Sequence, residues 1–313
     1  MHLLYRGIDD MDKKESRILL GRIDNEAKEW VDSRDHEALT ELGLSVLNSD
    51  NIIGSPDEFH NFAVNFAKTD DKIMACEILK RGLSKYPRSV DLLADFLQYG
   101  MDCGEEALCL KYYEELQKIP KELWTWRGFD FALDYLQAKI DTIAEAGKYE
   151  ETKREMIELV TEFRQYMPYE ERSYLAESRL YKNSNKELKI LEEAMSQLKS
   201  CPKCALRYAD LQCEMGEYVK ALNGIKQCLS SLKTQSGINE GYAYFLSGLC
   251  QTGILHTTGD YSNSESVRAI YQDFQVAEME SLGLQATYRK TIKRQTSILA
   301  IKSGIFYSGE YDE

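Results

Sequence analysis

The sequence predicts an all-α protein, a right-handed solenoid of helix–turn–helix repeats that stack side by side. The first observation is the spacing of the prolines at intervals of 31, 33, 48 and 34 residues: Pro56, Pro87, Pro120, Pro168 and Pro202. The second is that each proline lies between two amphipathic stretches, as expected of a residue that lacks a backbone N–H and clashes with the preceding helical turn. A spacing of about 34 residues is the period of a two-helix repeat, and such repeats stack into solenoids.

The composition is that of a long folded array. The chain has 313 residues, of which 43% are hydrophobic and 29% charged, which disfavours disorder. Its net charge of −13 repels phosphate backbones, so we expect no nucleic acid partner. No stretch approaches the roughly 18 apolar residues that a membrane span needs, so we expect no membrane partner either. Eight cysteines in a chain of this length indicate reduced thiols rather than a disulfide scaffold, and we expect a soluble, cytoplasmic protein.

Residues 56–87 show the repeat most plainly. One face of the predicted first helix holds four residues at i, i+3, i+4 and i+7, namely Phe59, Phe62, Ala63 and Phe66. Asp70 and Asp71 mark a turn, and a second helix continues the inward face through Ala75, Leu79 and Gly82. Moving 34 residues along the chain gives an equivalent set, with Leu93, Phe96 and Leu97 in the first helix. Large residues fill the interior and small ones stand where helices approach closely.

This pattern resembles the tetratricopeptide repeat. The best single match is 202–233, where Ala209 and Ala221 occupy the two small positions and Gly216-Glu217-Tyr218 forms the turn. The unit 169–202 matches more loosely, and the resemblance covers about 56–235. It implies a solenoid with a concave groove that binds a protein or peptide without catalysis.

We expect three parts along the chain. Residues 1–55 form a helical pair that caps the array, 56–235 form the repeats, and 236–313 form C-terminal helices near 238–257, 264–282 and 284–303. The segment 121–168 departs from the period. Its first helix is predicted to be overlong, from about residue 122 to 146, and to end at a turn over residues 147–151.

The sequence offers little for catalysis. Cys201 and Cys204 form its single CxxC pair, and a structural zinc site wants four ligands. We interpret both as core residues at a helix start, with metal or redox chemistry as the less favoured alternative. No phosphate loop, GxGxxG, GxSxG or HExxH occurs. We therefore expect no catalytic residue, no cofactor and no bound metal.

The resemblance also implies which residues bind a partner, because the family lines its groove with set positions of each first helix. The candidates transferred in this way are His60, Gln98, Arg172, Arg179, Lys182 and Asp210. The three cations among them are expected to share one helix face. A forked guanidinium suits carboxylates, so an acidic segment is a candidate partner. The alternative for this patch is a solvated face with local ion pairs to Glu170 or Glu171.

The favoured function is a non-catalytic scaffold that binds a protein or peptide segment. Chaperone-adaptor members of the family clamp a terminal carboxylate with Lys and Asn, but His60 and Val64 stand at the corresponding positions here. An alternative is a peptide-sensing receptor similar to bacterial regulators of this family, without their DNA-binding domain, since residues 9–12 are acidic and no basic recognition helix is present. An enzyme whose site carries no motif is the third possibility. The oligomeric state is not fixed by the sequence.

Overall fold

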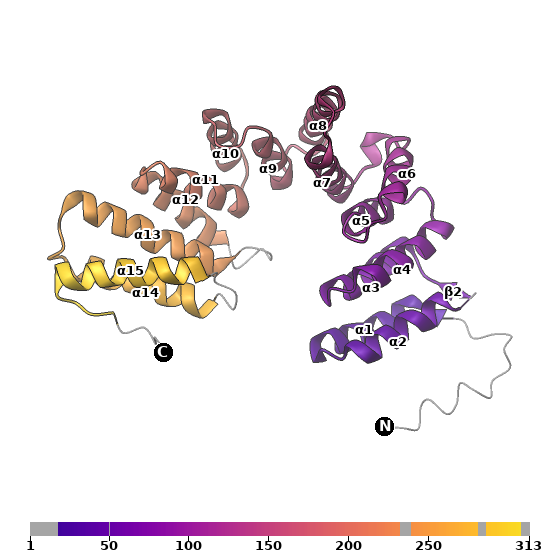
Figure 1. Ribbon diagram of the computed structural model, residues 1–313, viewed down its shortest axis with the longest axis horizontal. Helices are drawn as coiled ribbons and strands as arrows, with labels where there is room; N and C mark the ends of the chain where they lie inside the picture. Colours follow the sequence, from indigo (N-terminus) through magenta and orange to yellow (C-terminus); the bar gives the residue numbers. More distant parts are fainter. Residues whose placement is uncertain (1–17, 50, 232–238, 281–285, 308–313) are drawn as a thin grey trace. The chain divides into compact units, whose positions relative to one another are not determined.

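The computed structural model describes residues 18–49, 51–231, 239–280 and 286–307, and it divides into two compact units, Met1–Met167 and Pro168–Glu313 (Figure 1). The described residues form 15 α-helices, one short 3-10 helix and a pair of two-residue strands. The prediction of an all-α fold of helix–turn–helix units is therefore confirmed, apart from that strand pair. Residues 1–17 of the segment 1–55, which is expected to form the N-terminal helical pair, lie outside the described residues.

Unit 1 is a series of helical hairpins. Its helices are α1 (Leu20–Ser33), α2 (His36–Leu47), α3 (Pro56–Lys68), α4 (Lys72–Lys85), α5 (Val90–Gly100), α6 (Glu106–Gln117), α7 (Trp126–Thr142) and α8 (Ala146–Tyr166). The first helices of the hairpins, α1, α3, α5 and α7, each contact the next in the series. The strands β1 (Ile18–Leu19) and β2 (Ile52–Ile53) pair in parallel beside them.

Local signals set where these helices begin. Pro56 is the first residue of α3, and Ser55 and Glu58 form a reciprocal capping box around it. Side chains of Asp71, Ser89 and Thr125 accept backbone N–H groups at the starts of α4, α5 and α7. The turn between α3 and α4 passes through Asp70, which has a left-handed φ of 66°. The polar residues between the amphipathic stretches thus supply the caps that the helices need.

The predicted inward faces form the core. Phe59, Phe62, Ala63 and Phe66 have no exposed surface, and their counterparts Leu93 and Phe96 are equally buried. Gly82 allows the close approach of α4 to its neighbours, because a Cβ there would lie 3.0 Å from the Phe59 ring. The spacing i, i+3, i+4, i+7 therefore marks the buried stripe of each first helix.

The expected overlong helix over 122–146 is wrong. The structure instead has a 3-10 helix η2 (Lys121–Leu123), an extended residue at Trp124 and then α7. Trp124 is buried and its indole Nε1–H donates to the Ile119 carbonyl at 3.0 Å, while Thr125 caps α7, so the chain leaves η2 before the helix restarts. The turn expected over residues 147–151 lies inside the 21-residue helix α8, because Gly147 takes helical geometry there.

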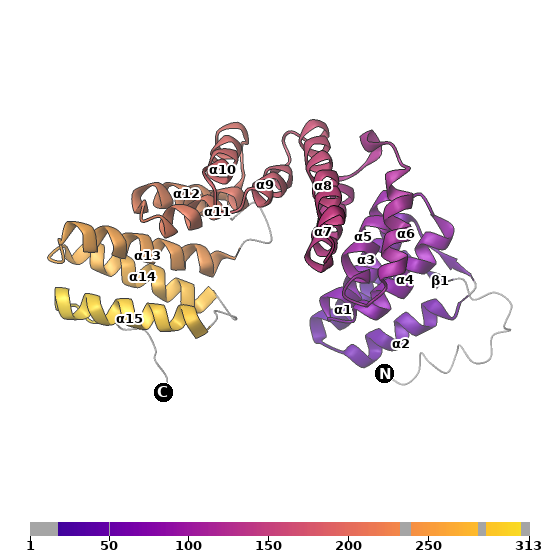
Figure 2. The same cartoon turned by 45° about the horizontal axis from the view of Figure 1, so that its top comes forward.

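Unit 2 continues the same local design. Its helices are α9 (Glu171–Leu180), α10 (Asn185–Gln197), α11 (Pro202–Glu214), α12 (Tyr218–Ser231), α13 (Glu240–Thr258), α14 (Ser264–Glu280) and α15 (Ala286–Ser303). Successive helices pack on one another, and α11 also contacts both α9 and α13. Figure 2 shows α13, α14 and α15 side by side in the orange and yellow part of the chain. The three last helices correspond to those expected near 238–257, 264–282 and 284–303. Within the described ranges, no helix has the length and apolar character needed to cross a membrane.

Candidate functional site

Neighbouring first helices of unit 1 are joined by polar side-chain contacts. The three bonds are Asn65 Nδ2 to Asp24 Oδ1 at 2.8 Å, His60 Nδ1 to Asp95 Oδ2 at 2.5 Å, and Thr125 Oγ1 to Asp91 Oδ1 at 2.6 Å. They link α1 to α3, α3 to α5 and α5 to α7 in turn. Each step of the helix series is thus fixed by a directional bond as well as by apolar packing.

Asp95 is the most buried charge in this series, with 2% of its side chain exposed. Burial raises the pKa of Asp95 above its ordinary value of 3.8, although His60 and Arg127 act to lower it. Its Oδ1 atom and the Nη1 atom of Arg127 are buried without a hydrogen-bond partner in the described part of the chain. The predicted residue His60 keeps 16% of its side chain exposed, and Gln98 of α5 is exposed. Unit 1 therefore places both candidates on first helices, with His60 already engaged.

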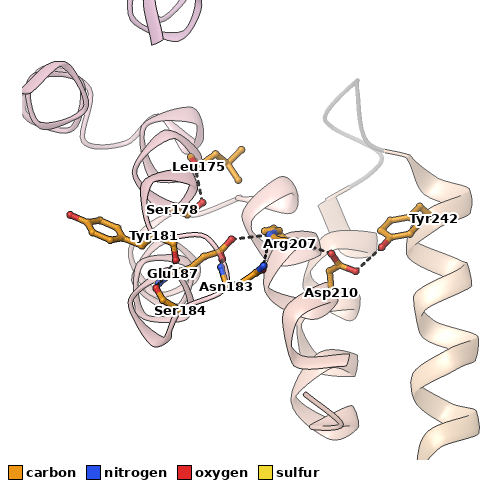
Figure 3. A network of polar contacts seen from close by, with 9 residues as sticks. All are labelled: Leu175, Ser178, Tyr181, Asn183, Ser184, Glu187, Arg207, Asp210 and Tyr242. Carbon is orange, nitrogen blue, oxygen red and sulfur yellow. Dashed lines mark hydrogen bonds and ion pairs between the residues drawn. The ribbon is translucent and has the colours of Figure 1, made fainter. Parts of the chain in front are cut away.

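Unit 2 holds a larger polar network that centres on Arg207 of α11 (Figure 3). Its Nε–H donates to Glu187 Oε1 at 2.9 Å, and its Nη1 donates to Asp210 Oδ2 at 3.0 Å. Asp210 Oδ1 accepts from the hydroxyl of Tyr242 on α13 at 2.6 Å. Glu187 Oε2 accepts from the backbone N–H of Asn183 at 2.5 Å. The network therefore joins α10, α11 and α13 and the turn before α10.

Burial and charge act together in this network. The Glu187 side chain is 2% exposed, whereas those of Arg207 and Asp210 are 28% and 20% exposed. Burial disfavours the charged form of Arg207, but its hydrogen bonds and charge pairing with Glu187 and Asp210 raise the pKa of the guanidinium overall. Burial and the bond to Asp210 raise the pKa of Tyr242, so this hydroxyl stays protonated and donates.

The predicted binding residue Asp210 is thus occupied by its own neighbours, because both its oxygens accept bonds from within the chain. Sequence reasoning missed its partners Arg207 and Tyr242, and it missed Glu187, which binds Arg207. A signal for such pairs does exist, since His60 and Asp95 are 35 residues apart, Asp91 and Thr125 are 34 apart, and Asp210 and Tyr242 are 32 apart. Complementary polar residues one repeat apart bridge adjacent first helices.

The cationic candidates lie at α9 and just beyond it. Arg172 is half-buried and Arg179 is exposed on α9, which ends at Leu180. Lys182 is exposed but stands in the turn after the helix, so the expectation that all three share one helix face is wrong for Lys182. Tyr181, with φ of −118°, ends the helix before Lys182 is reached. The α9 surface is therefore defined by the two arginines.

The CxxC cysteines belong to the core of unit 2, as predicted. Cys201 and Cys204 are fully buried at the start of α11, within a cluster that contains Tyr174 and Leu191. Burial raises the pKa of Cys201 to about 11, which disfavours the thiolate that metal binding requires. Among the described residues, no group of three or more His, Cys, Asp or Glu side chains is arranged to hold a metal ion.

Comparison with known proteins finds similarity in structure only. No family model and no curated protein matches the chain. A thermophilic tetratricopeptide-repeat protein of Thermus thermophilus matches at 14% identity and a TM-score of 0.48, over 64% of this chain and 100% of that one. A tetratricopeptide-repeat protein of Parabacteroides merdae matches at 15% identity and 0.49, over 90% and 98%. The TPR2AB domain of yeast Sti1 in its pHSP90 complex matches at 11% identity and 0.27, over 80% and 98%. Because these identities and TM-scores are low, we base the fold assignment on the helix pairs of this chain itself.

Proposed function

We propose that the protein is a non-catalytic scaffold that binds an extended protein or peptide segment on its first helices. The observation that supports this most is the serial packing of first helices within each unit, α1, α3, α5 and α7 in one and α9, α11 and α13 in the other. Such a series presents one face of every first helix along a single surface. We call it the first-helix surface of the unit.

The residues on this surface are of the kinds that recognise peptides. In unit 1, Gln98 of α5 is exposed; in unit 2, Arg179 of α9 is exposed, and Leu175 of α9 and Leu206 of α11 are half-buried. Half-buried apolar side chains supply contact area, and polar groups fix the register of a bound segment. With two arginines on α9 of a chain with net charge −13, an acidic segment is the proposed partner of unit 2.

The proposed setting is the cytoplasm. All eight cysteines are free thiols, and five are fully buried in helix interfaces where a thiol packs as a small apolar residue: Cys109, Cys201, Cys204, Cys228 and Cys250. This use of cysteine suits a reducing compartment. We assign no catalytic step to the protein.

The test is selection from a random displayed peptide library against the full chain, followed by calorimetry with the selected peptides. A variant with Arg172→Glu, Arg179→Glu and Lys182→Glu should weaken binding of acidic peptides at least tenfold. The matched control changes Lys189, Lys220 and Lys226, which are exposed on the second helices α10 and α12, to Glu. It alters net charge by the same amount and should bind as the unaltered protein does. Equal binding by both variants, or no selected peptide at all, would refute the assignment.

A further inference from the structure

Two cysteines of unit 1 face each other outside the surfaces described so far. Cys76 lies on α4, and Cys103 lies in the turn between α5 and α6, with their Sγ atoms 3.8 Å apart. Ion pairs flank this contact on both sides, since Lys72 Nζ lies 2.6 Å from Asp102 Oδ2 and Lys80 Nζ lies 2.8 Å from Glu105 Oε1. Positions 72, 76 and 80 share one face of α4 because they are four residues apart. That face and the turn are therefore held in register around the two sulfur atoms.

The remaining distance is small, and one partner can move. A disulfide needs an S–S separation of about 2.0 Å, so the sulfur atoms must approach by about 1.8 Å from their present 3.8 Å. Cys103 is not within a helix, and its backbone N–H bonds to the Tyr99 and Gly100 carbonyls at 3.2 Å each. Gly104 follows with φ of 73°, where no side chain restricts the turn. Closing the gap therefore falls to rotation of the Cys103 side chain and to this turn rather than to α4.

The two thiols differ in access. Cys76 is 2% exposed, and burial together with the neighbouring Cys103 raises its pKa. Cys103 is half-exposed. Exposed thiolates react with oxidants first, while buried thiols are inert until a reactive partner is presented to them. Cys103 thus stands where an oxidant arrives, with Cys76 behind it as the thiol that resolves the product.

We propose that Cys76 and Cys103 are a site of reversible oxidation by hydrogen peroxide, which joins them in an intramolecular disulfide. The Cys103 thiolate attacks one peroxide oxygen and becomes a sulfenic acid, and the hydroxide that leaves takes up the thiol proton to form water. The Cys76 sulfur then attacks the Cys103 sulfur, the S–O bond breaks, and the departing hydroxide takes the Cys76 proton as a second water. Two thiols are oxidised by two electrons and one peroxide is reduced to two waters.

The disulfide fastens the end of α5 to α4. It closes a loop that contains α5, the helix that carries Gln98, and it constrains the unfolded chain of unit 1. The oxidised protein should therefore unfold at a higher temperature than the reduced protein. This inference is independent of the proposed binding function, because it concerns thiols on α4 and on a turn.

A second thiol contact in unit 2 provides a comparison. Cys213 of α11 and Cys250 of α13 interact as well, since the neighbouring Cys250 thiol lowers the pKa of Cys213, and again one is half-exposed and the other buried. Both lie within helices, however, Cys213 in the last turn of α11 and Cys250 in the middle of α13, so neither belongs to a loop between helices as Cys103 does. Cys213→Ser is therefore the matched control for Cys103→Ser, since each replaces the half-exposed member of a thiol contact.

The experiment uses the full chain, reduced with a phosphine and then exposed to a slight molar excess of hydrogen peroxide. Remaining thiols are blocked with N-ethylmaleimide, and tryptic peptides are mapped by mass spectrometry. We expect the Cys76 and Cys103 peptides joined with the loss of two hydrogens, and separated again by phosphine. The thermal midpoint should rise on oxidation in the unaltered protein and in Cys213→Ser, but not in Cys103→Ser.

Two outcomes would overturn the proposal. One is Cys103 recovered as a sulfinic acid while Cys76 is still alkylated by maleimide. The other is Cys103 recovered only in disulfides between molecules. Peptide mapping of the unaltered chain distinguishes these outcomes from the expected disulfide. It needs no substitution, so it remains valid even if the serine variants change stability.

Discussion

Removing the guanidinium of Arg207 should destabilise unit 2, because the buried carboxylate of Glu187 would lose its charged partner. The Glu187 side chain is 2% exposed and accepts from Arg207 Nε at 2.9 Å, so Arg207→Leu leaves its Oε1 without this partner. Breaking a buried ion pair costs about 3–5 kcal/mol. Because 28% of the Arg207 side chain is exposed, solvent screening reduces this, and we expect a loss of about 2–3 kcal/mol.

The assay is urea unfolding followed by helical circular dichroism, in a double-mutant cycle with Glu187→Gln. For a unit of about 150 residues the loss corresponds to a fall in thermal midpoint of about 4–12 °C. The double variant should be more stable than Arg207→Leu alone, because Gln leaves no stranded charge. Arg268→Leu, at an exposed position of α14, is the control and should change stability by less than about 0.5 kcal/mol. An effect of Arg207→Leu as small as that of the control, or strict additivity in the cycle, would refute the reasoning.

The remaining predictions concern packing and pH. Gly224→Ala should lower the free energy of unfolding by about 1–2 kcal/mol, since its Cβ would lie 2.9 Å from the backbone oxygen of Ala205 and overpacking outweighs the gain in helix propensity. Gly147→Ala, with nothing within 4 Å of the new Cβ, should instead stabilise the chain by up to about 1 kcal/mol, and urea midpoints that moved in the same direction for both would contradict this. For Asp95 the folded state holds the proton more tightly than the unfolded state does, so the contribution of Asp95 to the free energy of unfolding falls as pH rises above 3.8. As pH rises above 3.8, the free energy of unfolding of Asp95→Asn should therefore increase relative to that of the unaltered protein. Urea titrations across a pH series would count against the raised pKa if the variant instead lost stability relative to the unaltered protein.

The apolar pattern of the sequence was sufficient to predict the hairpins. Phe59, Phe62 and Phe66 are buried as their spacing predicts. Residues at i, i+3 and i+7 lie on one face of a helix, so the helix buries all three by packing that face against its neighbours. Pro56 and Pro202 are the first residues of α3 and α11, where the missing N–H costs nothing.

The break in the helix before α7 could not be predicted from helix propensity and apolar spacing. Residues 122–146 are compatible with a continuous helix, and the chain departs from it because the Trp124 ring is buried and its indole N–H bonds to the Ile119 carbonyl. The free energy gained by burying Trp124 depends on the side chains that surround it, such as Phe129, whose ring centroid lies 5.0 Å from that of Trp124. Helix propensities describe single residues and do not include such contacts.

The sequence predicted on which helices the candidate residues lie, but not which side chains of the same chain bind them. Repeat alignment places His60, Gln98 and Asp210 on first helices, and the structure has them there. It does not foresee that His60 is held by Asp95 and Asp210 by Tyr242, because these partners come from other hairpins. It also missed the bond from Arg207, which lies on the same helix as Asp210. Arg179 and Gln98 are exposed candidates on the helices themselves, and the binding role of all six residues stays a prediction.

The most direct test of the account is site-specific photo-cross-linking of the full chain to a library-selected peptide. A benzophenone side chain is placed at Gln98 or Arg179 on the first helices, or at Glu114 or Lys226, which are exposed on the second helices α6 and α12. We expect the bound peptide to be captured from a first-helix position and not from a second-helix position. Capture from the second helices alone would contradict it.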